Sequence, residues 1–113
     1  MKLNITTWQR FLLLQIVGNA KGNILRVRKA MKALDVLEMT DAEKKQVGYV
    51  EHPGGATWQD AEHRGQLEIK DKEAAHLVKV EAEQYDNWPA AQGELVIDLV
   101  EQLGIKLEEE GVH

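Results

Sequence analysis

The spacing of apolar side chains predicts an amphipathic helix over residues 23–37, and the rest of the chain can be placed around it. On a helical wheel the apolar residues of this stretch fall on one arc and the basic residues fall opposite. The apolar stripe contains Ile24, Val27, Ala30, Met31, Leu34 and Leu37, and the basic face contains Arg26, Arg28, Lys29 and Lys32. We therefore expect one buried side and one basic side on this helix.

Two threonines mark the start of further helical segments. Thr6 begins the sequence Thr-Thr-Trp-Gln, and Thr40 begins Thr-Asp-Ala-Glu, and both have the form of a capping box. These motifs predict a helix over 7–17 and a short helical turn over 41–46.

Two more helices are predicted after residue 70. Asp71 is a natural N-cap for a helix that reaches about Tyr85, and Glu81 falls in the middle of its apolar face. A carboxylate at such a position needs a partner. Pro89 suits the first turn of the last helix, and Gly104 suits the position just after its end.

Between these helix pairs the pattern changes to that of strands. Segments 47–51 and 56–59 flank a His-Pro-Gly-Gly loop and predict a β-hairpin, with Tyr49 and Trp58 as candidates for one packed face. Residues 66–70 alternate strictly between polar and apolar and predict a third strand.

These elements predict the fold class. We expect an α+β domain, mainly helical, with about four main helices, a short helical turn, and a small antiparallel hairpin or three-stranded sheet inserted between the helix pairs. A length of 113 residues fits a single globular domain, which we place at 1–105. Residues 106–113 read as a frayed acidic tail.

Composition narrows the location and the chemistry. The longest apolar run is Phe11 to Leu14, which is far too short to cross a bilayer, and the first 17 residues lack the features of a signal peptide. A cytoplasmic protein without a membrane partner is therefore expected. The chain has no cysteine and no serine, which excludes disulfides, thiolate chemistry and a serine nucleophile.

Charge is distributed unevenly along the chain. Residues 1–34 contain seven basic residues and no acidic one, and the remainder contains seven basic residues and all 19 acidic ones. Either the basic face of the second helix neutralises acidic helices, or it binds nucleic acid. The nucleic-acid residues would be Lys21, Arg26, Arg28, Lys29 and Lys32, and the order helix, helix, short helix, hairpin matches that of a winged helix. A net charge of −5 and an acidic start to the short helix favour neutralisation.

The first predicted helix is apolar on nearly every side. Such a helix must be covered on two faces, either by its own domain or by a partner chain. The contact we expect is self-association as a dimer, with a host or phage protein as another possible partner. The proposed contact residues are Trp8, Phe11, Leu13, Leu14 and Val17.

The sequence contains little evidence for a metal site or a catalytic site. His52 and His63 lie next to acidic residues but lack the spacing of a zinc motif, so no metal site is predicted. Asp60, His63 and Glu81 would form a catalytic site only if the fold brought them together. We therefore predict no catalytic residue, no cofactor and no enzyme.

The assembled pattern resembles a group of small proteins of tailed bacteriophages and prophages. The likeness lies in the Trp-Gln-Arg-Phe-Leu-Leu-Leu opening, in Gly22-Asn23 before a basic amphipathic helix, in the threonine-capped acidic turn, in the hairpin ending Thr57-Trp58, and in the Leu67-Glu68-Ile69 strand. The resemblance implies a phage or prophage origin and carries no catalytic signature. The function we expect is non-enzymatic protein binding, with nucleic-acid binding as the alternative.

Overall fold

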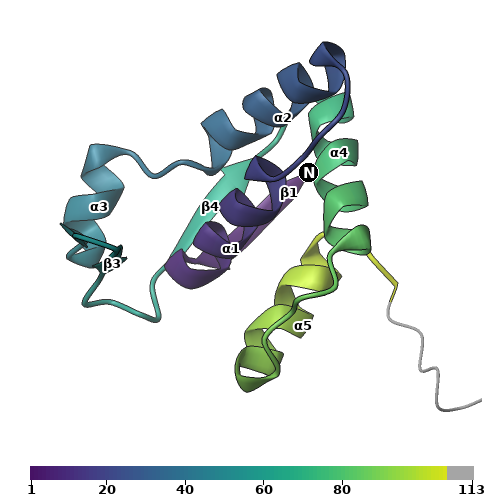
Figure 1. Cartoon of the computed structure of the whole chain (residues 1–113). Helices are drawn as coiled ribbons and strands as arrows, with labels where there is room; N and C mark the ends of the chain where they lie inside the picture. The colour runs from purple at the N-terminus through teal and green to yellow at the C-terminus, as the bar shows by residue number, and fades with distance from the viewer. Residues whose placement is uncertain (107–113) are drawn as a thin grey trace, which may run out of the picture.

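The computed structural model describes residues 1–106 and has an α+β fold that is mainly helical, with two small antiparallel sheets (Figure 1). This is the predicted fold class. In chain order the elements are β1 (Lys2–Thr6), α1 (Thr7–Gly18), α2 (Ile24–Leu37), α3 (Asp41–Val47), β2 (Val50–His52), β3 (Gly55–Thr57), β4 (Arg64–Glu68), α4 (Lys72–Gln84), the 3₁₀ helix η1 (Ala90–Gln92) and α5 (Gly93–Gln102).

The predicted caps start the helices. Thr6 accepts a hydrogen bond from the backbone N–H of Gln9, whose side chain accepts one from the backbone of Thr6, so the capping box of α1 is complete. Thr40 and Glu43 repeat the arrangement at α3. The last helix differs from the prediction, because a 3₁₀ turn follows Pro89 and α5 begins only at Gly93.

The strand at residues 64–68 pairs with an N-terminal strand that we did not predict. β1 and β4 are antiparallel, with Lys2 opposite Glu68 and Thr6 opposite Arg64. The hairpin β2–β3 forms a separate sheet, so the three-stranded alternative is wrong. The alternation of residues 2–6 is itself a strand signal, with Leu3 and Ile5 buried on one face.

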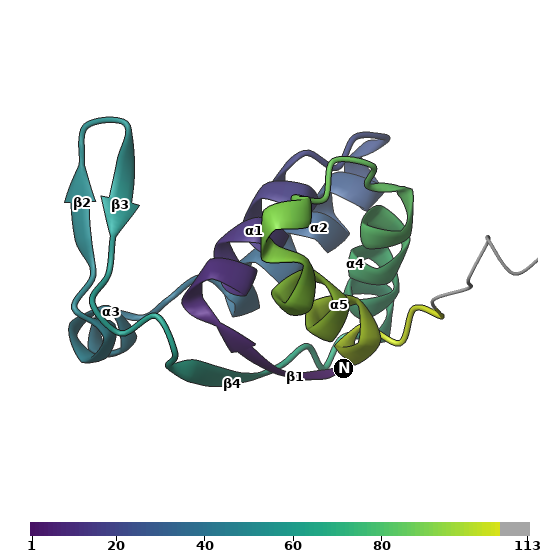
Figure 2. The ribbon, with the colours of Figure 1, turned by 90° about the horizontal axis from the view of Figure 1, so that it is seen from below.

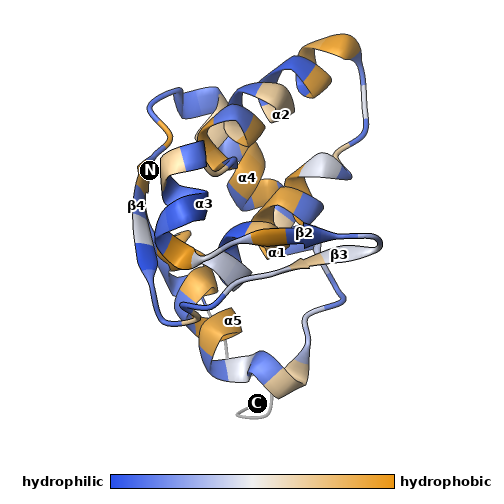
Figure 3. Cartoon of the chain, turned by 90° about the vertical axis from the view of Figure 1, so that its left-hand side faces the viewer, coloured by the Kyte–Doolittle hydropathy of each residue, from blue (hydrophilic) through white to orange (hydrophobic). Residues whose placement is uncertain are grey.

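The core lies where the β1–β4 sheet meets α1, α2, α4 and α5. In Figure 2 the sheet lies along one side of the helical layer, where α1, α2 and α5 contact its strands. Figure 3 shows apolar stretches on α1, α4 and α5, and the largest buried residues come from all these elements. They include Ile5, Leu13, Leu37, Ile69, Val78 and Leu99.

The buried face of α2 is rotated from the predicted stripe. Ala30, Ala33 and Leu37 are buried, whereas Ile24 is 75% exposed and Met31 57% exposed. The helical wheel placed the stripe on the largest apolar residues, but small alanines allow α2 to approach its neighbours closely. Two large apolar residues of the predicted stripe therefore remain on the surface.

A projecting unit separates the two halves of the β1–β4 sheet in sequence. We call α3 and the β2–β3 hairpin, residues 41–57, the hairpin arm. The hairpin extends beside the helical layer rather than packing into it (Figure 2), and it turns at Gly54, which has a φ of 87°. Apart from Lys106, the predicted acidic tail lies outside the described residues. None of the helices within residues 1–106 has both the length and the apolar character that a membrane-spanning segment requires.

Candidate protein-binding surface

The structure divides the predicted contact residues of α1 into two groups. Leu13 is fully buried and Val17 is 1% exposed, both within the core of their own chain. Trp8, Phe11 and Leu14 are half-buried. The expectation that α1 exposes a second apolar side is therefore wrong for Leu13 and Val17, because the sheet, α2, α4 and α5 cover them.

Three consecutive residues of α1 contact three different parts of the molecule. The first, Gln9, is fully buried and connects α1 to α5. Its Nε2 donates to the backbone oxygen of Leu95 at 2.8 Å and to Oδ2 of Asp98 at 2.9 Å. Burial raises the pKa of Asp98, but hydrogen bonds from Gln9, Arg64 and Gln102 lower it by more. The net pKa therefore lies below its ordinary value.

The second residue, Arg10, connects α1 to the end of α2 and the start of α3. Its Nε donates to the backbone oxygen of Leu37, Nη2 donates to that of Glu38 at 3.2 Å, and Nη1 donates to Oε2 of Glu43. A cation at the C-terminus of α2 also interacts favourably with the helix dipole. We call Arg10, Glu43 and the two carbonyl oxygens the Arg10 cluster, and it fixes where the hairpin arm begins.

The Arg10 cluster also sets the ionisation of Glu43. Burial raises the pKa of this carboxyl, but hydrogen bonds from Arg10 and Thr40 and the charge of Arg10 lower it more. The net pKa therefore lies below its ordinary value, and the carboxylate stays charged.

The third residue, Phe11, connects α1 to the hairpin. Its ring stacks on Tyr49 with centroids 5.8 Å apart and meets Trp58 at 5.3 Å. Tyr49 and Trp58 do share a packed face, as predicted, and Phe11 completes it. All three rings are only half-buried, so part of this aromatic surface stays accessible.

A groove of about 440 Å³ runs between these rings and the hairpin. We call it the aromatic groove. Its lining consists of Phe11, Tyr49, Glu51, His52, Gly55, Ala56 and Trp58. The rings supply an apolar floor, and Glu51 and His52 supply a polar edge. This combination is typical of a protein contact, in which aromatic anchors lie inside a polar rim.

The basic face of α2 pairs with α4. Arg26 forms an ion pair with Glu81, Lys29 pairs with Glu73 at 3.4 Å, and Lys32 pairs with Asp71 at 3.1 Å. Glu81 therefore has the partner that its position on an apolar face required. Intramolecular neutralisation, the first of the two readings of this face, accounts for these three cations.

The winged-helix order is not reproduced in space. A winged helix packs its third helix against the first two, whereas α3 lies to the side of the α1, α2 and α4 packing (Figure 2). Of the predicted nucleic-acid residues, Lys21 and Arg28 are exposed and form no ion pair within residues 1–106.

The structure separates the candidate catalytic residues. Asp60 and His63 lie in the loop after the hairpin, where Oδ1 of Asp60 accepts a hydrogen bond from the backbone N–H of His63. Glu81 lies on α4, on the other side of α1 (Figures 1 and 2). His52 bonds Thr57 across the hairpin, and among residues 1–106 there is no group of three or more potential metal-ligating side chains.

Comparisons with protein-family models, with curated protein sequences and with solved structures find no significant match for this chain.

Proposed function

We propose that this chain is a non-enzymatic protein of phage or prophage origin that acts in the host cytoplasm by binding another protein. The observation that carries the proposal is the aromatic groove, where rings from α1 and from both sides of the hairpin meet and stay half-exposed. Exposed aromatic residues cost solvation free energy unless they are covered, and they dominate the energetics of many protein interfaces.

The shape of the groove favours a protein segment that inserts one apolar side chain. Tyr49 and Trp58 each contact Phe11, so the three rings form one shared apolar surface on which a single aliphatic or aromatic side chain would rest. Glu51 and His52 at the edge would hydrogen-bond the polar backbone of the same segment.

The proposal is tested by blocking the groove without removing a ring. A photo-cross-linking amino acid at position 56 should capture a protein from a bacterial host lysate, and the same probe at exposed position 83 on α4 should not. The captured protein, once purified, should bind the chain at least about tenfold more weakly after Ala56→Glu, because a carboxylate is desolvated in the groove. Ala91→Glu, the same change at an exposed position on η1, is the matched control. Equal binding by Ala56→Glu and the unmodified chain would refute the proposal.

Nucleic-acid binding is the second candidate, and Lys21 and Arg28 are the observation in its favour. Both are exposed cations without an ion pair in residues 1–106. Binding to duplex DNA at low salt, weakened by added salt and by Arg28→Ala with Lys32→Ala, would support it. We expect no such binding, since three of the five predicted residues already pair with α4.

A further inference from the structure

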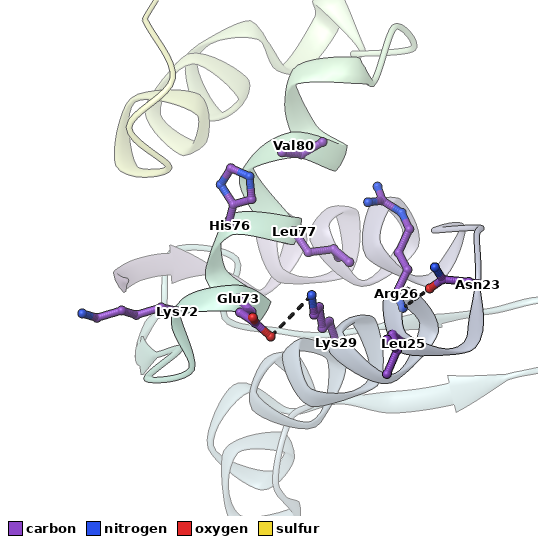
Figure 4. Close-up of a pocket in the computed structure, with 9 residues that line it drawn as sticks. All are labelled: Asn23, Leu25, Arg26, Lys29, Lys72, Glu73, His76, Leu77 and Val80. Atoms are coloured by element: carbon purple, nitrogen blue, oxygen red, sulfur yellow. Dashed lines mark hydrogen bonds and ion pairs between the residues drawn. The ribbon is translucent and has the colours of Figure 1, made fainter.

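A second groove, of about 670 Å³, lies between α2 and α4, away from the aromatic groove (Figure 4). We call it the basic groove. Leu25, Leu77 and Val80 supply its apolar wall, and Arg26, Lys29 and Lys72 supply its cations. Figure 4 shows Leu77 between the two helices and Lys72 and His76 pointing outward from α4.

Positive charge is in excess around the basic groove. Glu73 and Glu81 pair with Lys29 and Arg26, but Lys72 on α4 and Arg28 on α2 form no ion pair within the described chain. Both of these cations are exposed. The groove therefore attracts a negatively charged surface at low ionic strength.

Three large apolar side chains of α2 also lie exposed, two in its first turn and one near its middle. Ile24 is 75% exposed, Leu25 is 60% exposed and Met31 is 57% exposed. A helix that combines exposed apolar residues with excess positive charge fits an acidic amphipathic helix better than it fits nucleic acid, because phosphates offer nothing for the apolar residues.

The chain itself carries such a helix. The outer face of α5 presents Glu94, Ile97 and Glu101 at i, i+3 and i+7 spacing. Both glutamates are exposed and lack an ion pair within residues 1–106, and Ile97 is 48% exposed. We call these three residues the acidic ridge. Figure 1 places α5 at the opposite end of the molecule from α2.

We propose that the acidic ridge of one copy docks into the basic groove of a second copy. Ile97 meets the apolar wall at Leu25, and the two glutamates approach Arg28 and Lys72. Because the groove and the ridge are different surfaces, each added copy leaves one of each unoccupied. Association is therefore head-to-tail and continues beyond a dimer, unlike the two-fold dimer expected from α1.

This contact is independent of the aromatic groove, so either proposal can fail without the other. It buries one short helix, which is a small interface, and its attraction is electrostatic. The average mass in solution should therefore rise with protein concentration and fall as salt is added.

Charge reversal in two separate chains tests the contact. The groove variant carries Arg28→Glu and Lys72→Glu, and the ridge variant carries Glu94→Lys and Glu101→Lys. All four side chains are exposed, and circular dichroism verifies that both variants fold. Controls with the same change in net charge are Lys45→Glu with Lys70→Glu, and Glu62→Lys with Glu38→Lys, at exposed positions that line neither surface.

Sedimentation velocity at low salt gives the readout. We expect each test variant alone to associate at least about tenfold more weakly than the unmodified chain, an equimolar mixture of the two to recover association, and the controls to behave like the unmodified chain. Recovery in the mixture is specific to a groove-to-ridge contact. A strictly monomeric unmodified chain at high concentration, full association by either variant alone, or a mixture that stays monomeric would each overturn the proposal.

Discussion

Arg10 and Glu43 form an ion pair across 33 positions of sequence, and the pair joins α1 to the start of the hairpin arm. The guanidinium is nearly buried, and its other donors satisfy two backbone oxygens at the end of α2. Removing one member of such a group leaves buried polar atoms without partners.

Arg10→Met should therefore destabilise the fold by about 3 kcal/mol, because Glu43 and two carbonyl oxygens lose their donor while the aliphatic volume is kept. The free energy of unfolding from urea titration measures the effect. The matched control is Lys29→Met, which removes an ion pair at the surface and should cost less than about 1 kcal/mol. Similar costs for the two variants would contradict the structural role of Arg10.

Acid should weaken the protein through Glu43. Its pKa is lower in the folded state than the ordinary value of 4.5, so the charged carboxylate stabilises the folded state above pH 4.5. This stabilisation is lost as the pH falls through the lower, folded-state pKa. The free energy of unfolding, measured from pH 7 downward, should fall less steeply in Glu43→Gln than in the unmodified chain. The exposed control Glu83→Gln should follow the unmodified chain, and parallel curves for all three would exclude the effect.

Gly65 leaves room for the Arg10 cluster. A Cβ atom there would lie 3.2 Å from Nη1 of Arg10 and 3.4 Å from Oε2 of Glu43, and Arg10 cannot move without breaking its hydrogen bonds. Gly65→Ala should therefore cost about 1 kcal/mol of unfolding free energy. Gly93→Ala, in the first turn of α5 with no atom within 4 Å of the new methyl, should instead stabilise by about 0.5 kcal/mol. A gain in stability from Gly65→Ala would show that the strand can shift there.

Trp58 should hold the hairpin against α1. Trp58→Ala removes the ring that contacts Phe11, so amide hydrogen exchange should become faster in β2 and β3 while α1 stays protected. The control is Trp88→Ala, which removes the edge-to-face contact with Tyr85 at the end of α4 and should leave hairpin exchange unchanged. Unchanged hairpin protection in Trp58→Ala would mean that other contacts position the arm.

Two neighbouring leucines of α1 distinguish core from surface. Leu13→Ala should cost about 3 kcal/mol, because Leu13 is fully buried and leaves a cavity, whereas half-buried Leu14→Ala should cost about 1 kcal/mol. Urea unfolding of both variants measures the difference. Equal losses of unfolding free energy in the two variants would contradict the assignment of Leu13 to the core and Leu14 to the surface.

Local signals in the sequence were enough to predict the helices and the hairpin. Each cap, at Thr6, Thr40 and Asp71, forms between residues that are at most three positions apart. The local sequence is therefore enough to predict where these helices begin. The position of Glu81 on an apolar helix face also predicted that its carboxylate has a partner, and in the structure that partner is Arg26.

Contacts between residues that are distant in the sequence were harder to predict. β1 was not predicted although residues 2–6 alternate, because a strand of five residues is stabilised by its partner, and the partner of Thr6 is Arg64, far along the chain. Arg10, a charge on an otherwise apolar helix, was the same kind of signal as Glu81 and would have indicated a buried ion pair. The amphipathic wheel misplaced Ile24 and Met31, since periodicity shows that one face is buried but not how a small residue such as Ala33 turns the helix.

The order Gln9, Arg10, Phe11 has a consequence for how this chain tolerates change in length. Successive side chains of a helix point about 100° apart, and here that divergence aims one side chain at α5, the next at the α2–α3 junction and the third at the hairpin. Inserting or deleting a single residue between Thr6 and Gln9 would redirect all three anchors together. A substitution can alter one of these anchors at a time, but a change of one residue in the length of this turn would break the contacts of α1 with three regions of the molecule at once.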